Sequence, residues 1–231
     1  MRKILLLAAA AMLVAAKHAP DGPLLLNASN LDPALLLPTP PRDDSALGKA
    51  ELAQLHVIDH TRTPEEVAQA QADGATKNVS IFAGVMGPGF DLDRLPATKA
   101  LFHTVREEEK AAADRAKDHF RRNRPWITDP SLHACAKDDE PQSSYPSGHT
   151  SMGFAMASIL ARLAPSKAPA IMGRAAEYAH SRLVCEVHFP SDVTAGQAFG
   201  MIIADRLMEQ PAFRPQFEAA RIELIKSGLI S

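Results

Sequence analysis

Apolar residues recur at helical spacing along most of this chain. In the charge-rich range 98–123, for example, the apolar residues that follow the helical period are Leu101, Val105, Ala112, Ala116 and Phe120. Helices are predicted for residues 46–60, 64–73, 98–123, 150–163, 169–186, 191–208 and 215–225. No competing strand pattern alternates apolar and polar residues. The pattern therefore predicts an all-α fold, built as a single compact helical bundle.

Local signals divide the rest of the chain. Residues 17–46 are rich in Pro, Leu and Asp, which predicts an extended arm that wraps around the domain without belonging to its core. Residues 84–89 are expected to form a loop, and they lack the Gly-Lys-Ser/Thr ending of a nucleotide-binding loop. Residues 126–146 are expected to form a second loop. Thr63, followed by Pro64, predicts a capped helix start.

The first sixteen residues have the pattern of a secretory signal peptide. Arg2 and Lys3 precede an apolar stretch that ends in small residues at Ala16. A buried N-terminal helix and a retained anchor are the alternatives. We expect residues 1–16 to be removed, residues 17–46 to form the arm, and residues 47–231 to form the helical domain in the periplasm or outside the cell. No later apolar run reaches 18 residues, so we expect no stable membrane insertion after cleavage.

The charge and the cysteine content bear on the partners and the cellular compartment of the protein. Without the signal peptide the chain keeps 23 of its 25 basic residues against 27 acidic ones, which argues against a nucleic-acid partner. Export to an oxidising compartment predicts a disulfide between Cys135 and Cys185. Two separate buried thiols are one alternative. A zinc site that includes His133 and His188 is another, although the spacings do not match common zinc patterns.

The first candidate site segment contains Lys117 and Arg124. Seven residues are close to two helical turns, so both side chains are expected to leave one helix face, with Pro125 ending that helix. A lysine supplies a point charge, and an arginine supplies a planar fork that matches two phosphate oxygens. The alternative is a pair of ordinary solvated charges, because residues 106–124 contain many of them.

The second segment is Pro146-Ser147-Gly148-His149, just before a helix expected to begin near Thr150. Free N–H groups and the positive end of the helix dipole make such a start an anion site. Gly148 allows close backbone approach to an anion, and His149 is placed to act as a general acid. The alternative is an ordinary helix start capped by Ser147.

The third segment carries Arg182, His188 and Asp192. Arg182 offers a further anion contact. We expect Asp192 to accept the ring N–H of His188, which would fix the tautomer and leave the other nitrogen free to attack. The alternative is a core histidine followed by a capping aspartate.

Together the segments read Lys-x6-Arg-Pro, Pro-Ser-Gly-His and Ser-Arg-x5-His-x3-Asp. This arrangement resembles the three-part motif of the type 2 phosphatidic acid phosphatase and vanadium haloperoxidase superfamily. The closer resemblance is to the secreted class A bacterial nonspecific acid phosphatases. That similarity includes the signal peptide, a Leu-Leu-Pro-rich stretch at 36–41, the cysteine positions and residues 144–151. It thins in residues 47–97.

The resemblance implies a residue-by-residue mechanism. His188 would be the nucleophile that forms a phosphohistidine, and Asp192 would orient it. His149 would protonate the leaving alcohol and then activate water. The residues implied to bind the phosphate oxygens are Lys117, Arg124, Ser147, Gly148 and Arg182. No metal or other cofactor is implied, because these groups can neutralise the transferring phosphoryl group.

We therefore expect a broad-range acid phosphatase that acts on small phosphorylated substrates with an optimum below about pH 7. A vanadate-dependent haloperoxidase, a lipid phosphate phosphatase and a non-catalytic phosphate-binding protein are the alternatives. The sequence leaves open the physiological substrate, the extent of phosphotransfer to alcohols, and a homodimer.

Overall fold

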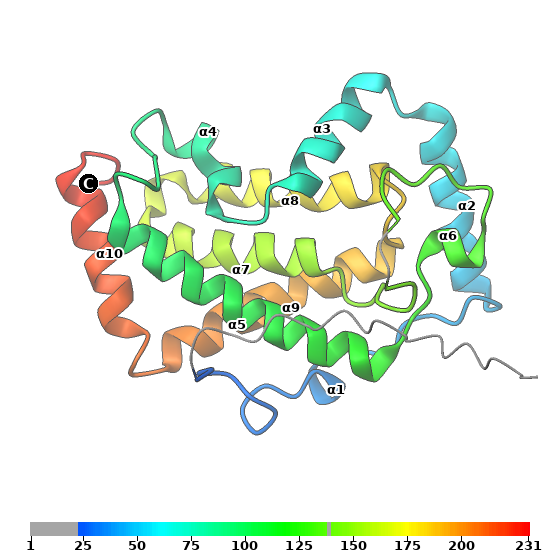
Figure 1. Ribbon diagram of the computed structural model, residues 1–231, viewed down its shortest axis with the longest axis horizontal. Helices are drawn as coiled ribbons and strands as arrows, with labels where there is room; N and C mark the ends of the chain where they lie inside the picture. Colours follow the sequence, from blue (N-terminus) through cyan, green and yellow to red (C-terminus); the bar gives the residue numbers. More distant parts are fainter. Residues whose placement is uncertain (1–22, 138–139) are drawn as a thin grey trace, which may run out of the picture.

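The computed structural model describes residues 23–137 and 140–231, and every regular element in these ranges is a helix (Figure 1). The longer helices are α2 (Ala46–Thr61), α3 (Pro64–Ala75), α5 (Pro96–Phe120), α7 (Gly148–Leu163), α8 (Ala168–Val184), α9 (Pro190–Glu209) and α10 (Arg214–Lys226). The shorter elements are α1 (Pro33–Leu36), η1 (Val79–Phe82), α4 (Ala83–Met86), α6 (Pro125–Thr128) and η2 (Pro165–Lys167). The predicted all-α fold is confirmed.

Helix α7 lies at the centre of the bundle, between α8, α9 and α5 (Figure 1). Its closest neighbour is α9, because two glycines on α9 allow the backbones to touch. A Cβ atom on Gly200 would lie only 2.3 Å from the Ser151 carbonyl oxygen, and one on Gly196 would lie 2.8 Å from the Ser147 carbonyl oxygen. This close packing fixes the N-terminus of α7 against the N-terminus of α9, and both ends carry predicted site residues.

The end of α5 differs from the prediction. The helix stops at Phe120, because Arg121 adopts the left-handed conformation with φ 48°. Residues 121–124 are not helical, and Arg124 instead precedes the short helix α6. The expectation that Lys117 and Arg124 share one helix face is therefore wrong. The reversal of the chain after α5, rather than helical periodicity, brings these two residues to the same site.

Two expected loops also contain helix. Residues 83–86 form α4, which ends at Gly87 with a positive φ of 105°, so the predicted 84–89 loop begins later. The predicted 126–146 loop begins with most of α6. Both helices have only four residues, which is too short to leave a clear periodic pattern in the sequence.

The N-terminal arm contributes to the core, contrary to expectation. Its described part contains α1, and Leu26, Leu31 and Leu37 are buried in the main hydrophobic cluster. The backbone N–H groups of Leu25 and Leu26 donate to the buried Glu108 carboxylate on α5 at 2.6 and 3.0 Å. The predicted signal peptide, residues 1–16, lies outside the described residues. Within the described ranges, no helix is both long and apolar enough to cross a bilayer.

Candidate active site

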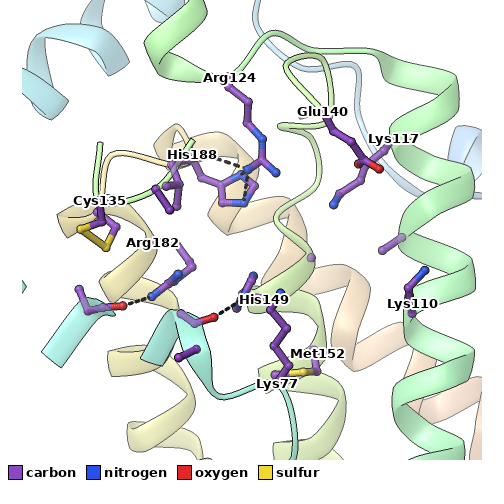
Figure 2. A pocket seen from close by; sticks show the side chains of 18 of the residues that line it. Lys77, Lys110, Lys117, Arg124, Cys135, Glu140, His149, Met152, Arg182 and His188 are labelled. Carbon is purple, nitrogen blue, oxygen red and sulfur yellow. Dashed lines mark hydrogen bonds between the residues drawn. A yellow bond between two sulfur atoms is a disulfide. The ribbon is translucent and has the colours of Figure 1, made fainter. Parts of the chain in front are cut away.

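A cavity of about 660 Å³ brings the three predicted segments together (Figure 2). The predicted site residues that line it are Lys117, Arg124, Gly148, His149, Arg182 and His188. Asp192 is fully buried, and its carboxylate contacts the back of the His188 ring. Ser147 is also fully buried, and its backbone N–H donates to the Asp192 carbonyl oxygen at 3.0 Å. That N–H is therefore already used, which leaves Gly148 rather than Ser147 at the cavity wall.

His188 lies in the short connection between α8 and α9 and is only 2% exposed. The Arg124 Nη1 atom lies 2.8 Å from its Nε2 atom and 3.3 Å from its Nδ1 atom, so the contact to Nε2 is the shorter one. An arginine can only donate, so the shorter contact assigns Nε2 as the acceptor and places the proton of the neutral ring on Nδ1. This tautomer keeps the lone pair of Nε2 on the side of the cavity where the cationic side chains gather (Figure 2).

Asp192 does not hold this ring in the predicted way. Its Oδ2 atom lies 3.6 Å from Nδ1 of His188, which is longer than a hydrogen bond. The same oxygen accepts hydrogen bonds from the Ser144 hydroxyl at 2.6 Å and from the Phe189 N–H at 2.8 Å. Asp192 thus faces the ring as a negative charge, while its hydrogen bonds fix the surrounding backbone.

Arg122 is a residue that the sequence analysis missed. It is 5% exposed and donates to Asp192 Oδ1 at 2.6 Å and to Glu51 Oε2 at 2.7 Å. Glu51 in turn accepts from the Ser191 N–H at 2.6 Å. Arg122 stands in a run of polar and charged residues, so only burial distinguishes it from its solvated neighbours. Its contacts connect α2 to the start of α9.

Backbone carbonyl groups hold two arginines of the cavity. Arg182 Nη2 donates to the Ala70 carbonyl oxygen at 2.5 Å, and Arg124 Nη1 donates to the Val187 carbonyl oxygen at 2.8 Å. The Lys117 ammonium lies close to the start of α7, 3.3 Å from where a Cβ atom on Gly148 would stand. A larger residue than glycine would crowd that ammonium.

His149 makes one hydrogen bond that defines its tautomer. Its Nε2 atom lies 3.0 Å from the Gly74 carbonyl oxygen, near the end of α3 (Figure 2). A carbonyl oxygen only accepts, so Nε2 carries a proton and Nδ1 is the nitrogen left to exchange one. Helix α3 belongs to the region where the sequence resemblance thins, and no motif predicted that its carbonyl groups would orient the site.

Burial and positive charge shift the titration of both histidines. Burial, followed by Arg124 and Lys117, lowers the pKa of His188 well below 6.5. Burial, followed by Arg182, lowers the pKa of His149 well below 6.5. Burial also raises the pKa of Asp192, against the opposing effect of Arg122. Both histidines therefore favour their neutral forms until an anion enters the cavity.

A disulfide joins Cys135 to Cys185 beside the cavity, as predicted. The bridge uses both sulfur atoms, so the alternatives of separate thiols and of zinc ligation by these cysteines are wrong. Glu186 follows the bridge, with φ 55° and a fully buried side chain. Its carboxylate lies 3.6 Å from Arg62 and close to Asp59 and the His133 backbone, and burial raises its pKa.

Comparisons with known proteins agree with this geometry. The family model of the PAP2 superfamily matches residues 100–215. The chain is 34% identical over 204 residues to an acid phosphatase of Zymomonas mobilis, covering 85% of this chain and 76% of that protein. It is 30% identical over 215 residues to a non-specific acid phosphatase of Providencia stuartii, covering 90% and 86%.

A solved structure, LpxE from Aquifex aeolicus, has a similar fold with a TM-score of 0.53 and 21% sequence identity. The similarity covers 71% of this chain and 95% of that one. At this identity the match supports the fold alone. The family model and the two relatives carry the assignment: the chain belongs to the PAP2 superfamily, and over most of its length it is related to bacterial non-specific acid phosphatases.

Proposed function

We propose that this acid phosphatase of the PAP2 superfamily hydrolyses small phosphomonoesters through a phosphohistidine on His188. The observation that carries the proposal is the state of that ring. It is buried, burial and the nearby cations lower its pKa well below 6.5, and its Nε2 atom faces a cavity lined by Lys117, Arg124 and Arg182. A neutral imidazole among fixed positive charges is suited to attack an anionic phosphorus centre.

In the first step, the substrate phosphate replaces the Arg124 contact at Nε2 of His188. The Nε2 lone pair attacks phosphorus, and the bond from phosphorus to the alcohol oxygen breaks. Protonated His149 gives its proton to that oxygen, so a neutral alcohol leaves. The phosphorylated ring becomes positively charged, and the Asp192 carboxylate, 3.6 Å from Nδ1, offsets this charge.

In the second step, His149 is neutral and accepts a proton from a water molecule as the water attacks phosphorus. The bond between phosphorus and Nε2 breaks, which releases inorganic phosphate and restores neutral His188. We infer that Nδ1 of His149 transfers the proton in both steps, because Nε2 is held by the Gly74 carbonyl group. The three cations neutralise the non-bridging oxygens throughout.

The pH dependence of kcat/KM follows from the free enzyme. Raising the pH through the pKa of His149 removes the proton that the leaving group needs. Lowering the pH through the pKa of His188 protonates the nucleophile. Both pKa values lie well below 6.5, so we expect a bell-shaped profile with its maximum on the acid side of pH 6.5. An optimum above about pH 8 would contradict this assignment.

The test of the proposed function is turnover of p-nitrophenyl phosphate and of an alkyl phosphate at pH 5 to 6 with EDTA present. His188→Ala should lose turnover and keep affinity for vanadate, because the cations remain. His149→Ala should slow the alkyl ester more than the p-nitrophenyl ester, whose leaving group needs less protonation. The exposed His180→Ala on α8 is the matched control. Wild-type turnover by His188→Ala would exclude the phosphohistidine.

Measurements of bromination and of phosphate binding, made beside the turnover assay, separate the alternative functions. Bromination with vanadate and peroxide in the absence of phosphatase activity would indicate a haloperoxidase. Phosphate binding without turnover would indicate a non-catalytic protein. We also propose that residues 1–16 direct export to the periplasm or the medium, since the Cys135–Cys185 disulfide is typical of oxidising compartments. The mass of the protein recovered from those fractions tests cleavage after Ala16.

A further inference from the structure

The lining of the cavity includes three more cations besides those at the proposed phosphate position. These are Lys77, Arg106 and Lys110. Two of them have carboxylate partners on α5: Arg106 Nη1 lies 2.7 Å from Glu109 Oε2, and Lys110 Nζ lies 2.8 Å from Asp114 Oδ2. Lys77 is exposed and has no ion-pair partner among residues 23–137 and 140–231. Its charge is therefore available to a ligand.

Lys77 lies on the same side of the cavity as the proposed general acid. Figure 2 shows its side chain beside Met152, running toward His149. Its positive charge contributes to lowering the pKa of His149, after the larger effects of burial and Arg182. Under the proposed function, His149 contacts the leaving oxygen. A substituent on the leaving alcohol therefore passes close to the Lys77 ammonium.

The backbone on both sides of Lys77 is anchored, so its side chain starts from a fixed point. The Thr76 carbonyl oxygen accepts a hydrogen bond from the Tyr178 hydroxyl at 2.7 Å, and the Asn78 side chain caps η1 by accepting from the Ser80 N–H at 2.8 Å. Tyr178 is itself fully buried against α7. The loop backbone therefore needs little further ordering when Lys77 binds a ligand.

We propose that Lys77 forms a second anion subsite on the leaving-group side of the cavity. The subsite would favour phosphomonoesters whose alcohol carries a second anionic group, either a carboxylate or another phosphate. This inference rests on the proposed function, because it uses His149 to locate the leaving group. It goes further by naming a class of substrates. The phosphate-binding residues alone would not distinguish this class from other phosphomonoesters.

The experiment compares kcat/KM for matched esters at about pH 6. One pair is 4-carboxyphenyl phosphate and 4-carbamoylphenyl phosphate, which differ mainly in charge. The other is propane-1,3-diol bisphosphate and its monophosphate, which separates phosphate from carboxylate recognition. The readout is the anionic-to-neutral ratio within each pair. Lys77→Met should lower this ratio about two- to fivefold, as expected for one partly exposed ion pair, and Lys77→Glu should lower it further.

Lys77→Arg should restore most of the ratio, and about 0.5 M NaCl should reduce it in the wild-type enzyme by screening. Lys99→Met is the control, since Lys99 is exposed, pairs with Asp93 and does not line the cavity. A ratio unchanged by Lys77→Met, or an equal loss for both esters, would overturn the subsite. Failure of the wild-type enzyme to hydrolyse the neutral esters would instead remove the proposed function.

Discussion

Replacing Arg122 by methionine tests the buried network behind the proposed nucleophile. Arg122 donates to the carboxylates of Asp192 and Glu51, which are 0% and 5% exposed, and to the Ser191 hydroxyl at 2.7 Å. Methionine keeps much of the side-chain volume and removes every one of these donors. Two buried carboxylates would then lose their shared cation, and Asp192 would keep only the Ser144 hydroxyl and the Phe189 N–H.

The expected cost follows from that burial. Removing one partner of a buried ion pair typically costs about 3–5 kcal/mol, because the remaining charge stays desolvated. For a domain of this size, each kcal/mol lowers the Tm by roughly 2–4 °C. We therefore expect Arg122→Met to unfold about 6–20 °C below the wild-type protein, as measured by circular dichroism during heating.

The loss of stability caused by Arg122→Met should also depend on pH. Burial raises the folded-state pKa of Asp192 above 3.8, and Arg122 opposes that rise, so Arg122→Met should raise it further. A carboxyl group with a raised folded-state pKa loses stability as the pH increases through that pKa. The Tm difference between variant and wild-type protein should therefore be larger at pH 8 than at pH 5.

The neighbouring Arg121→Met is the matched control, because Arg121 is exposed and bonds only to Gln142 among the described residues. We expect it to change the free energy of unfolding by less than about 0.5 kcal/mol. If Arg122→Met were as stable as Arg121→Met, or equally destabilised at pH 5 and pH 8, the network would not have the role that its geometry suggests.

Three further predictions concern stability and can be checked by thermal or urea unfolding. Glu186→Gly should stabilise the protein by about 1–2 kcal/mol, because it relieves a left-handed φ of 55° and removes a buried carboxylate; a lower Tm would contradict this. Replacing both Cys135 and Cys185 by alanine should cost up to about 4 kcal/mol, given their separation of 50 residues, and an unchanged urea midpoint would refute it. Gly200→Ala should cost about 1–3 kcal/mol by forcing α9 away from α7, whereas Gly173→Ala, with open space around it, should be neutral or stabilising.

The sequence predicted the helices and most of the residues that the fold brings to one cavity, for a physical reason. Long amphipathic helices leave a periodic pattern, and under the proposed function the chemistry of phosphate binding restricts which residues stand at His149, His188 and Arg182. The end of α5 was missed because Arg121 adopts a left-handed conformation that its residue type does not signal. Lys117 and Arg124 therefore line one cavity as predicted, but they do not share a helix face, which was the predicted reason.

Supporting residues were harder to predict than reacting ones. Arg122 and Glu51 are 71 positions apart and have ordinary neighbours, so only their burial in the fold identifies them as partners. The carbonyl groups of Ala70 and Gly74 have no side-chain signature at all, since every residue has such a group. Their contribution depends on where α3 ends, and that position is set by packing against α8.

The end of α3 also has an electrostatic consequence. The Gly74 carbonyl that binds His149 lies in the last turn of α3, at the negative end of a helix dipole worth roughly half an elementary charge, and the Ala70 carbonyl that binds Arg182 lies one turn earlier. This end of α3 acts as a fractional counter-ion that a substrate need not displace. The buried Asp73 carboxylate of the same turn bonds to Arg174 and Ser181, so the direct contact to Arg182 comes from a backbone carbonyl group. Backbone dipoles can thus hold a cation in position while leaving most of its charge for the substrate.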